Sequence, residues 1–411
     1  MREDWTECCF EDLLDYEQPT KYIVESTDYN DSFKTPVLTA GKSFIKGYTN
    51  ETEGIFDNLP TIIFDDFTTA SQFVNFKFKV KSSAMKILVP TSKLVNMDFA
   101  YYAMQVNQIR SDTHKRYWIS VYAKKKFLLP SAVEQDSIVS KIEELISDLD
   151  KGTADLKKAQ NQLKVYRQAV LKKAFENLEK ETTLEEIKED SLIGLVRASG
   201  LQNSNGEGTA YLKMDKIDMI GNIELEDLVY VETNEDEIKK YALKTGDILI
   251  NTRNSYELVG KTGIVRNINK TVVFNNNIMR IRVNESYDPY FICYQLISPF
   301  VRKQMDKFKK ATTSVCALYQ RNLFPLKLKV TDIKEQHQIV QEIESRLSVC
   351  DKVKQNISQS LEKAKALRQS ILKKAFDGTL LSAEEIAACK AAKDYESASL
   401  LLKKIKAEKN K

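Results

Sequence analysis

Two long segments of the chain, residues 129–183 and 329–377, place apolar residues at alternating steps of four and three, with charged and amide residues between them. This spacing predicts two long helices, each with one apolar stripe, that pair as a coiled coil. Each helix packing only on its own domain is the alternative, but equal length and a single stripe favour mutual packing. The predicted interface residues are Ile138, Ile142, Leu145, Leu149, Leu156 and Leu163 in the first segment and Ile339, Ile343, Ile357 and Leu367 in the second.

The two segments also repeat each other at one fixed offset. RQAVLKKAF at Arg167–Phe175 returns as RQSILKKAF at Arg368–Phe376, and Glu134 returns as Glu335, so both offsets are 201 (368 − 167 and 335 − 134). A single offset without a gap is what a continuous helix requires. The repeated phrase fits an amphipathic helix end, with lysines favourable at the C-terminal dipole. It also fits a surface presented twice to two copies of a partner.

The remaining residues form two strand-rich globules and a tail. Residues 1–128 carry turn signals and apolar runs such as TIIF and MKILV. Residues 184–328 contain GDILI and TGIVR, which predict strands, and YFICYQLIS, which predicts a helix or a strand. Residues 378–411 predict a helical tail. The predicted fold class is α+β: two mixed α/β domains joined by a pair of long antiparallel coiled-coil helices with pseudo-two-fold symmetry, one globule at each end of the helical rod.

Composition narrows the classes of protein further. The 411 residues carry a net charge of +4, which permits nucleic-acid binding without arguing for it. Six cysteines without a CxxC pair indicate reduced thiols in a cytosolic protein, and two histidines exclude a multi-histidine metal site. No apolar run reaches the ~18 residues of a membrane span, and the acidic start is not a signal peptide.

The chain resembles the specificity subunits of type I restriction–modification systems. The resemblance rests on LLPSAVEQDSIVSKIEELISDLDKG (128–152), RQAVLKKAF, EQHQIVQEIESRL and RQSILKKAFDGTLL, with ASLLLKKIKAEK in the tail. In the second globule it rests on YLKMDKID, on GDILINTRNSYELVGKTGIV (246–265) and on ATTSVCALYQRNL (311–323), and in the first on HKRYWISVYAKKKFLLP (114–130). It is weakest across residues 1–110. The second helix lacks a counterpart of Pro130, which puts only the turn into that helix in question.

The resemblance implies a non-catalytic subunit of a restriction enzyme and adenine-DNA methyltransferase complex. Each domain would read one half of a bipartite double-stranded DNA target, while the rod sets the spacer and docks two methyltransferase subunits. Restriction-translocase subunits would join through the complex. S-adenosylmethionine, ATP and Mg are expected in the partner subunits and no cofactor on this chain, in the cytoplasm of a bacterium or archaeon. A specificity subunit of a related type II (BcgI-like) system is the alternative.

Basic and amide side chains in both globules are candidates to contact DNA. Period two along FKFKVK puts three lysines on one strand face, where they suit phosphates. NTRNS follows a strand and offers Arg253 for guanine and two asparagines for adenine. A solvated strand face and a hydrogen-bonded turn are the respective alternatives. The candidates are Lys42, Lys46, Tyr48, Lys77, Lys79, Lys81, His114, Lys115, Arg116 and Tyr117 in the first globule, and Asn251, Arg253, Asn254, Lys261, Arg266, Lys309, Lys310 and Arg321 in the second.

Three signals resemble catalytic motifs and are rejected. SYELVGKT has Ser255 where a phosphate-binding loop needs its first glycine, and a strand rather than a helix follows. The sequence around Asp288, YDPY, has one proline where an adenine methyltransferase has two, and no glycine-rich cofactor loop precedes it. Asp65 and Asp66 indicate a turn rather than a metal pair. No catalytic residue and no metal ligand is therefore predicted. A fused methyltransferase or nuclease would need one of these sites, and a pure coiled-coil scaffold would leave the globules unexplained.

Overall fold

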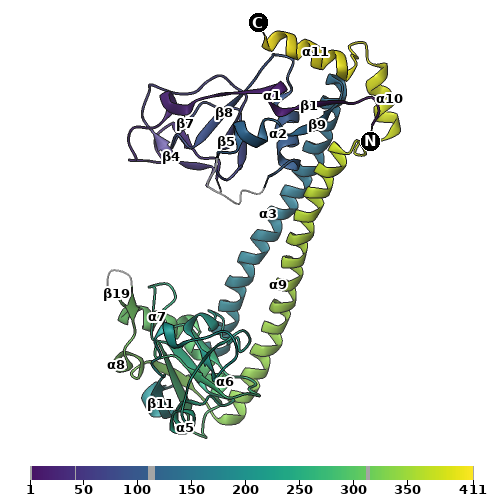
Figure 1. The fold of residues 1–411 in the computed structure, drawn as a ribbon. Helices are drawn as coiled ribbons and strands as arrows, with labels where there is room; N and C mark the ends of the chain where they lie inside the picture. Colours follow the sequence, from purple (N-terminus) through teal and green to yellow (C-terminus); the bar gives the residue numbers. More distant parts are fainter. Residues whose placement is uncertain (1, 42, 110–115, 312–314, 411) are drawn as a thin grey trace. The chain divides into compact units, whose positions relative to one another are not determined.

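The long helices and two strand-rich domains dominate the structure, a computed structural model that describes residues 2–41, 43–109, 116–311 and 315–410 (Figure 1). The chain forms two compact units. The first unit contains residues 1–156 and 359–411, and the second contains residues 157–358. Helices α3 (Ala132–Glu176) and α9 (Ile333–Phe376) each contribute residues to both units. The predicted α+β class is confirmed.

Among its described residues, the domain of the first unit is built from short strands, two α-helices and two further helical turns, Pro19–Tyr22 and Trp118–Tyr122. Its four-stranded antiparallel sheet has the order β2-β8-β5-β6, and a three-stranded sheet has the order β4-β3-β7. Strand β1 pairs with β9, so the two ends of the domain meet. The elements are β1 (Thr6–Cys9), α1 (Phe10–Leu13), β2 (Leu14–Glu17), β3 (Thr35–Leu38), β4 (Ile45–Thr49), β5 (Thr61–Asp65), β6 (Ser71–Val74), β7 (Lys79–Val80), β8 (Met85–Pro90), α2 (Met97–Val106) and β9 (Lys126–Leu129).

The domain of the second unit has the same sheet topology. Its four-stranded antiparallel sheet has the order β11-β18-β14-β16, its three-stranded sheet has the order β13-β12-β17, and β10 pairs with β21 as β1 pairs with β9. A further small sheet, β15-β20-β19, has no equivalent among the described sheets of the first domain. The elements are β10 (Lys180–Thr183), α4 (Leu184–Ile187), β11 (Lys188–Ile193), β12 (Thr209–Leu212), β13 (Val229–Val231), α5 (Glu235–Tyr241), β14 (Ile248–Asn251), β15 (Arg253–Asn254), β16 (Thr262–Ile264), β17 (Val272–Phe274), β18 (Ile278–Val283), α6 (Pro289–Leu296), α7 (Pro299–Phe308), β19 (Lys310–Ala311), β20 (Cys316–Ala317), α8 (Gln320–Leu323) and β21 (Lys327–Val330).

Local sequence explains most of these elements. TIIF and GDILI become β5 and β14, central strands whose residues are almost all buried, as an uninterrupted apolar run predicts. YFICYQLIS becomes helix α6, because Pro289 occupies the first turn and Asp288 caps it by accepting from the backbone N–H groups of Tyr290 (2.7 Å) and Phe291 (3.3 Å). FKFKVK forms only the two-residue strand β7.

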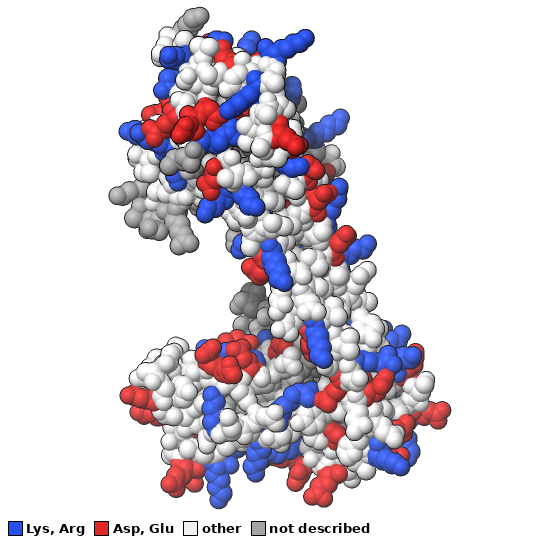
Figure 2. Space-filling view, turned by 90° about the vertical axis from the view of Figure 1, so that its right-hand side faces the viewer, with Lys and Arg blue, Asp and Glu red and all other residues white. Residues whose placement is uncertain are grey.

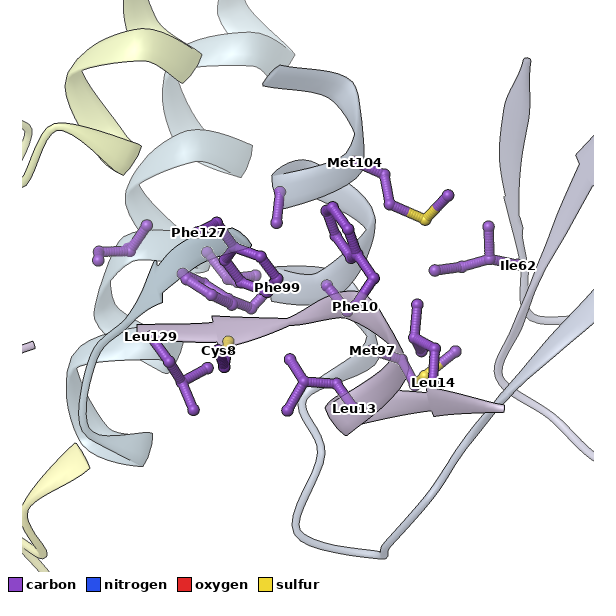
Figure 3. Packing of buried hydrophobic residues seen from close by; sticks show 14 of the residues in the cluster. Cys8, Phe10, Leu13, Leu14, Ile62, Met97, Phe99, Met104, Phe127 and Leu129 are labelled. Atoms are coloured by element: carbon purple, nitrogen blue, oxygen red, sulfur yellow. The ribbon is translucent and has the colours of Figure 1, made fainter. Parts of the chain in front are cut away.

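Aromatic side chains pack together within the core of the first unit. The rings of Phe10 and Phe127 lie 4.5 Å apart, and Figure 3 shows them beside Phe99 and above Leu13, between helix α2 and the strands. Phe99 in turn contacts Phe376 of α9, with ring centroids 5.0 Å apart. Full burial of such a side chain contributes roughly 1.5–3 kcal/mol, so this core fastens the domain to the end of α9.

Within each unit α3 and α9 are joined by an ion pair, and the two ion pairs are copies of each other. In the first unit Arg368 Nη1 lies 2.7 Å from Asp150 Oδ1, and in the second Arg167 pairs with Asp351. The repeat offset converts one pair into the other, since 150 + 201 = 351 and 167 + 201 = 368. Pairs that exchange in this way require antiparallel helices, as predicted.

Both helices begin with the same hydrogen bond. The buried Gln135 side chain donates Nε2 to the carbonyl of Pro130 (3.0 Å), and the buried Gln336 donates Nε2 to the carbonyl of Thr331 (2.8 Å). Threonine therefore supports the turn where the first copy has proline, which answers the question raised by the missing proline.

The C-terminal tail belongs to the first unit, where it covers the N-terminal strand and the start of α3. Helix α11 (Ala398–Lys409) contacts α1 and β1, and Lys406 pairs with Asp12 at 3.1 Å. Helix α10 (Ala383–Ala391) lies against α3, with Cys389 Sγ 3.2 Å from Ser137 Oγ. The predicted helical tail is thus a part of the first domain's packing.

Gly378 turns the chain from α9 into this tail. Its φ of +74° and the hydrogen bonds from Thr379 N–H to the Lys374 carbonyl and from Gly378 N–H to the Ala375 carbonyl form a Schellman cap. A Cβ here would lie 2.5 Å from Arg2 Cγ. We expect Gly378→Ala to lower the free energy of unfolding of the first unit by about 1–2 kcal/mol, with faster proteolysis in the tail. Gly152→Ala, with no atom within 4 Å of the new Cβ, is the matched control and should not destabilise.

Candidate nucleic-acid interface

The small sheet β15-β20-β19 of the second unit borders a cleft of about 310 Å³. In Figure 1, β19, α7 and α8 lie together on one side of this domain, away from α6. The cleft combines a guanidinium, amides, a phenol and a hydroxyl with apolar side chains. Its lining residues are Ile193, Gly194, Val196, Thr252, Arg253, Asn276, Ala317, Leu318, Tyr319 and Gln320.

Arg253 is the exposed basic group of this cleft. Its backbone N–H donates to Asn251 Oδ1 (3.2 Å), and the short strand β15 fixes the direction of its backbone through pairing with Ala317. The next residue, Asn254, is half-buried and uses Oδ1 to accept from the Ser255 N–H at 2.8 Å. Arginine and asparagine are the side chains that read guanine and adenine edges in a groove.

Exposed aromatic residues surround these groups. The Arg321 guanidinium lies over the Tyr319 ring at 5.3 Å, and Lys309 Nζ lies 5.0 Å from the Tyr256 ring centroid. Tyr319 and Tyr256 are 45% and 50% exposed. Rings beside cations hold the charges in place. The exposed Arg321 is available to a polyanion, whereas the Lys309 side chain is only 9% exposed. Lys309 also pairs with Asp306 at 2.7 Å, and the side chain of the neighbouring Lys310 lies outside the described residues.

Two predicted contacts in the second unit, Asn251 and Lys261, are buried, which corrects their assignment, and a third, Arg266, is half-buried in an ion pair. Asn251 is 0% exposed and Lys261 is 7% exposed, with burial lowering the pKa of Lys261. Arg266 donates Nη1 to Glu344 Oε1 (2.6 Å) and Nη2 to the Tyr294 hydroxyl (2.7 Å). Asn251 and Lys261 therefore belong to the interior of the domain rather than to its surface.

The Arg266 network joins the domain to α9. Burial would lower the pKa of Arg266, but hydrogen bonds to Glu344 and Tyr294 outweigh it and raise the pKa. Burial raises the pKa of Tyr294 to about 12, so the phenol stays protonated and bridges to Glu344 Oε1 at 3.2 Å. The guanidinium is thereby held against the helix.

In the first unit Lys79 was predicted to lie at the surface, but the structure places it in the interior. It is 4% exposed, lies 2.8 Å from Glu51 Oε2 and donates Nζ to the carbonyl of Glu53 (2.7 Å). The alternation in FKFKVK therefore does not create a face of three lysines. The predicted residues at the surface of this domain are Lys46, Tyr48, Lys77, Lys81 and Arg116, of which Tyr48 is half-buried.

Two further predicted residues of the first domain differ in exposure. Lys77 pairs with Asp57 at 3.4 Å while remaining 68% exposed. Tyr117 is buried, and its N–H donates to the Asp66 carbonyl. Lys42, His114 and Lys115 lie outside the described residues.

The rejected catalytic signals have structural roles. Asp288 is the cap of α6. Asp65 Oδ1 accepts from the N–H groups of Phe67 and Thr68, both at 2.9 Å, and thus forms the predicted turn. Asp66 Oδ1 accepts from the Trp118 N–H at 2.8 Å. Among the described residues no three His, Cys, Asp or Glu side chains group as metal ligands, and no helix is long and apolar enough to cross a membrane.

The predicted helix interface divides between buried and exposed positions. Ile138, Ile142, Ile343 and Ile357 are buried, and Leu145, Leu149, Leu156, Leu163 and Ile339 are half-buried. Leu367 is 52% exposed and lies outside the buried stripe. Near the helix ends the stripe widens onto the domains, where it includes residues that heptad spacing alone did not select: Val139, Ile146, Leu171, Phe175, Val340, Leu347, Leu372 and Ala375.

Charge is distributed rather than concentrated. On the face shown in Figure 2, basic and acidic side chains alternate over each unit. Among the described residues, this face therefore presents no block of basic side chains. Sequence inspection missed Tyr319, Gln320 and Asn276 in the cleft at β15, and the signal available was their place in ALYQRNL and FNNN beside predicted strands.

Known proteins resemble the chain along most of its length. The family model for the type I restriction modification DNA specificity domain matches residues 195–363. The chain is 30% identical over 370 residues to the specificity subunit of the type I restriction enzyme EcoR124I/EcoR124II of Escherichia coli, covering 85% of this chain and 89% of that one. It is 26% identical over 294 residues to the EcoKI specificity subunit of Escherichia coli strain K12, covering 68% and 63%.

A solved structure supports the fold. A chain from work on complex assembly and conformational transition of the type I R-M system superposes with a TM-score of 0.68 at 16% identity, covering 92% of this chain and 99% of that one. These curated relatives are type I subunits, which favours the type I interpretation over the type II alternative. The chain belongs to the family of type I restriction enzyme specificity subunits, which are non-catalytic DNA-recognition subunits.

Proposed function

We propose that the two domains each read one half of a bipartite double-stranded DNA target. The observation that carries this proposal is the shared topology: two sheets of identical strand order recur in both domains, each domain closed by one pair of end strands and followed by one copy of the repeated helix. Duplicated readers connected by antiparallel copies of one helix match the approximate dyad of duplex DNA. Helices α3 and α9 would set the unread spacer.

The same helices are proposed to dock modification subunits, two in number, through which restriction subunits join. The relatives are named as subunits of restriction enzymes, which supports assembly with other subunits. S-adenosylmethionine, ATP and Mg would be held by those partners, so that methylation at adenine and DNA cleavage take place outside this chain. The cytoplasm is the proposed location.

In the second domain the cleft at β15 is proposed as the base-reading surface. Arg253 would contact a guanine edge, and Arg321 would contact phosphates. We expect Arg253→Ala to weaken discrimination at one base pair of the second half-site by roughly 5- to 150-fold, about 1–3 kcal/mol, while the first half-site is read as before. Competition binding of the chain with its modification subunit, on DNA varied one base pair at a time, measures this.

A matched control is Lys239→Ala, an exposed lysine on α5 in the same domain. It should leave discrimination unchanged, and Arg321→Ala should reduce affinity for all sequences and flatten its salt dependence. A complex that prefers no DNA sequence would refute the proposed function.

A further inference from the structure

Two aliphatic side chains border the cleft at β15 and remain exposed to solvent. Val196 is 67% exposed and Ile193 is 36% exposed, and both line the cleft that also contains Arg253. Single exposed aliphatic residues are ordinary on a protein surface, so exposure alone assigns no role. Val196 is distinguished by the backbone on either side of it, which the domain holds in place.

The residue before Val196 is buried and hydrogen-bonded through both backbone groups. Leu195 is 6% exposed and lies in a small apolar cluster with Tyr211. Its N–H donates to the carbonyl of Phe274 (2.7 Å), and its carbonyl accepts from the Tyr211 hydroxyl (2.7 Å) and the Asn276 N–H (3.1 Å). The backbone that leads into Val196 is therefore fixed to the end of strand β17.

The residue after Val196 is held by its own side chain. Arg197 donates Nη2 to Glu237 Oε1 (2.7 Å) and Oε2 (2.6 Å), and it donates Nε to the carbonyl of Glu232 (3.2 Å). Its Nη1 donates to the carbonyl of Val196 (3.0 Å). The backbone of Val196 is thus fixed on both sides, while its side chain is exposed at the cleft.

A fixed aliphatic group beside an arginine suits one chemical group of DNA. In the major groove, where arginine reads guanine, the apolar group that a base pair presents is the C5-methyl group of thymine. Valine is stiff about χ1, and its backbone here is already ordered. Contact with a methyl group therefore costs little further conformational entropy, and the apolar surface removed from water favours binding.

We propose that Val196 contacts the C5-methyl group of a thymine in the second half-site, at a base pair next to the one that Arg253 reads. Neighbouring base pairs are expected because both side chains line one cleft of about 310 Å³. Ile193 extends the apolar border of that cleft. This inference rests on the proposed function, to which it adds a specificity-determining residue and the identity of one base.

The test uses the full-length chain assembled with its modification subunit, and duplexes of the recognised sequence. Each thymine of the second half-site, in either strand, is replaced in turn by deoxyuridine, which removes only the C5-methyl group. Competition binding should show about fourfold weaker binding at one thymine, the size expected for one buried methyl group. That thymine should adjoin the base pair at which Arg253→Ala weakens discrimination. In the Val196→Ala chain the loss at this thymine should fall below about 1.5-fold.

Two further variants separate contact with the methyl group from a general effect on the domain. Val196→Ile keeps an aliphatic side chain and should retain the loss on deoxyuridine. Leu201→Ala is the matched control, because Leu201 is 66% exposed in the same loop and is not among the residues that line the cleft. It should also retain the loss. Circular dichroism confirms that all three variants fold.

Several outcomes would overturn the inference. They are a second half-site without thymine in either strand, equal binding of all the deoxyuridine duplexes, and a loss that does not adjoin the Arg253 base pair. A loss that Val196→Ala leaves unchanged would overturn it too, as would a Val196→Ala chain that binds thymine and deoxyuridine duplexes with the same difference as before. If the complex still prefers one bipartite sequence in these cases, the proposed function stands without the thymine contact. A complex without sequence preference would remove both.

Discussion

Exchanging residues 180–330 for the corresponding segment of another family member should change one half of the recognised DNA sequence and leave the other half intact. The exchange points are given by the antiparallel pair β10–β21, in which Lys180 lies opposite Val330, so both ends of the domain meet at one place. The long helices then keep their own residues and ion pairs, and with them the spacer. Preference for the original second half should fall by about 10³-fold or more, the usual gap between specific and non-specific binding.

Methylome sequencing of cells that carry the chimera with its modification subunit measures this outcome. The matched exchange uses residues 6–129, where β1 pairs with β9 in the same manner, with Thr6 opposite Leu129. It should change the other half only. A chimera in which both halves or the spacer change would contradict the assignment of one domain to each half-site.

The long helices could be predicted from sequence because their signal is local and repeated. The spacing of the apolar residues and the repeat offset of 201 predicted helices within residues 129–183 and 329–377. Helix α3 (Ala132–Glu176) and helix α9 (Ile333–Phe376) lie within these segments. The predicted first segment extends beyond the helix, since Lys180–Thr183 form strand β10. Short strands at a helix end are decided by their pairing partner, which lies far away in sequence.

The common topology of the two domains was not visible in the sequence. The domains repeat a small capped turn, in which Cys9 and Asp12 correspond to Thr183 and Glu186, both as capping boxes. Such a turn is too short to reveal a repeat by itself. The order of the strands depends on which face of each strand is apolar and buried. Because different apolar residues can fill the same face, two domains can share a strand order without sharing a recognisable sequence.

Two of the basic residues predicted to contact DNA, Lys79 and Arg266, are instead paired with acidic residues that lie elsewhere in the sequence. Lys79 alternates with buried phenylalanine and valine, which favours an exposed position, yet Glu51 draws it into a buried pair. Arg266 follows a strand as a surface arginine would, yet Glu344 lies beside it at 2.6 Å. Composition and period contain no information on such pairings. Arg253 remains exposed because its two-residue strand ends at the edge of the cleft.

Both copies of the repeated phrase RQxxLKKAF pack apolar side chains against a domain. In both copies the leucine is buried and the lysines are exposed, so packing accounts for the repetition of the apolar residues. Phe175 is 4% exposed and meets Phe291 edge to face, with centroids 5.3 Å apart. Its equivalent Phe376 is half-buried against Phe99.

We therefore expect unequal losses from the same substitution. Phe175→Ala should lower the free energy of unfolding of the second unit by about 3–5 kcal/mol, because it removes a fully buried ring and leaves a cavity. Phe376→Ala should lower that of the first unit by about 1–3 kcal/mol, since part of its ring already contacts water.

Hydrogen exchange measured by mass spectrometry resolves the two units, and denaturant titration gives the sizes of the losses. The matched controls are the exposed lysines of the same phrase. Lys172→Ala and Lys373→Ala should each change stability by less than about 0.5 kcal/mol. If the lysine variants were as damaging as the phenylalanine variants in the isolated chain, the phrase would be repeated for its charge rather than for its packing. If instead the lysine variants fold normally but assemble poorly with the modification subunit, the same nine residues serve both purposes, with the apolar side chains facing the domain and the lysines facing the partner.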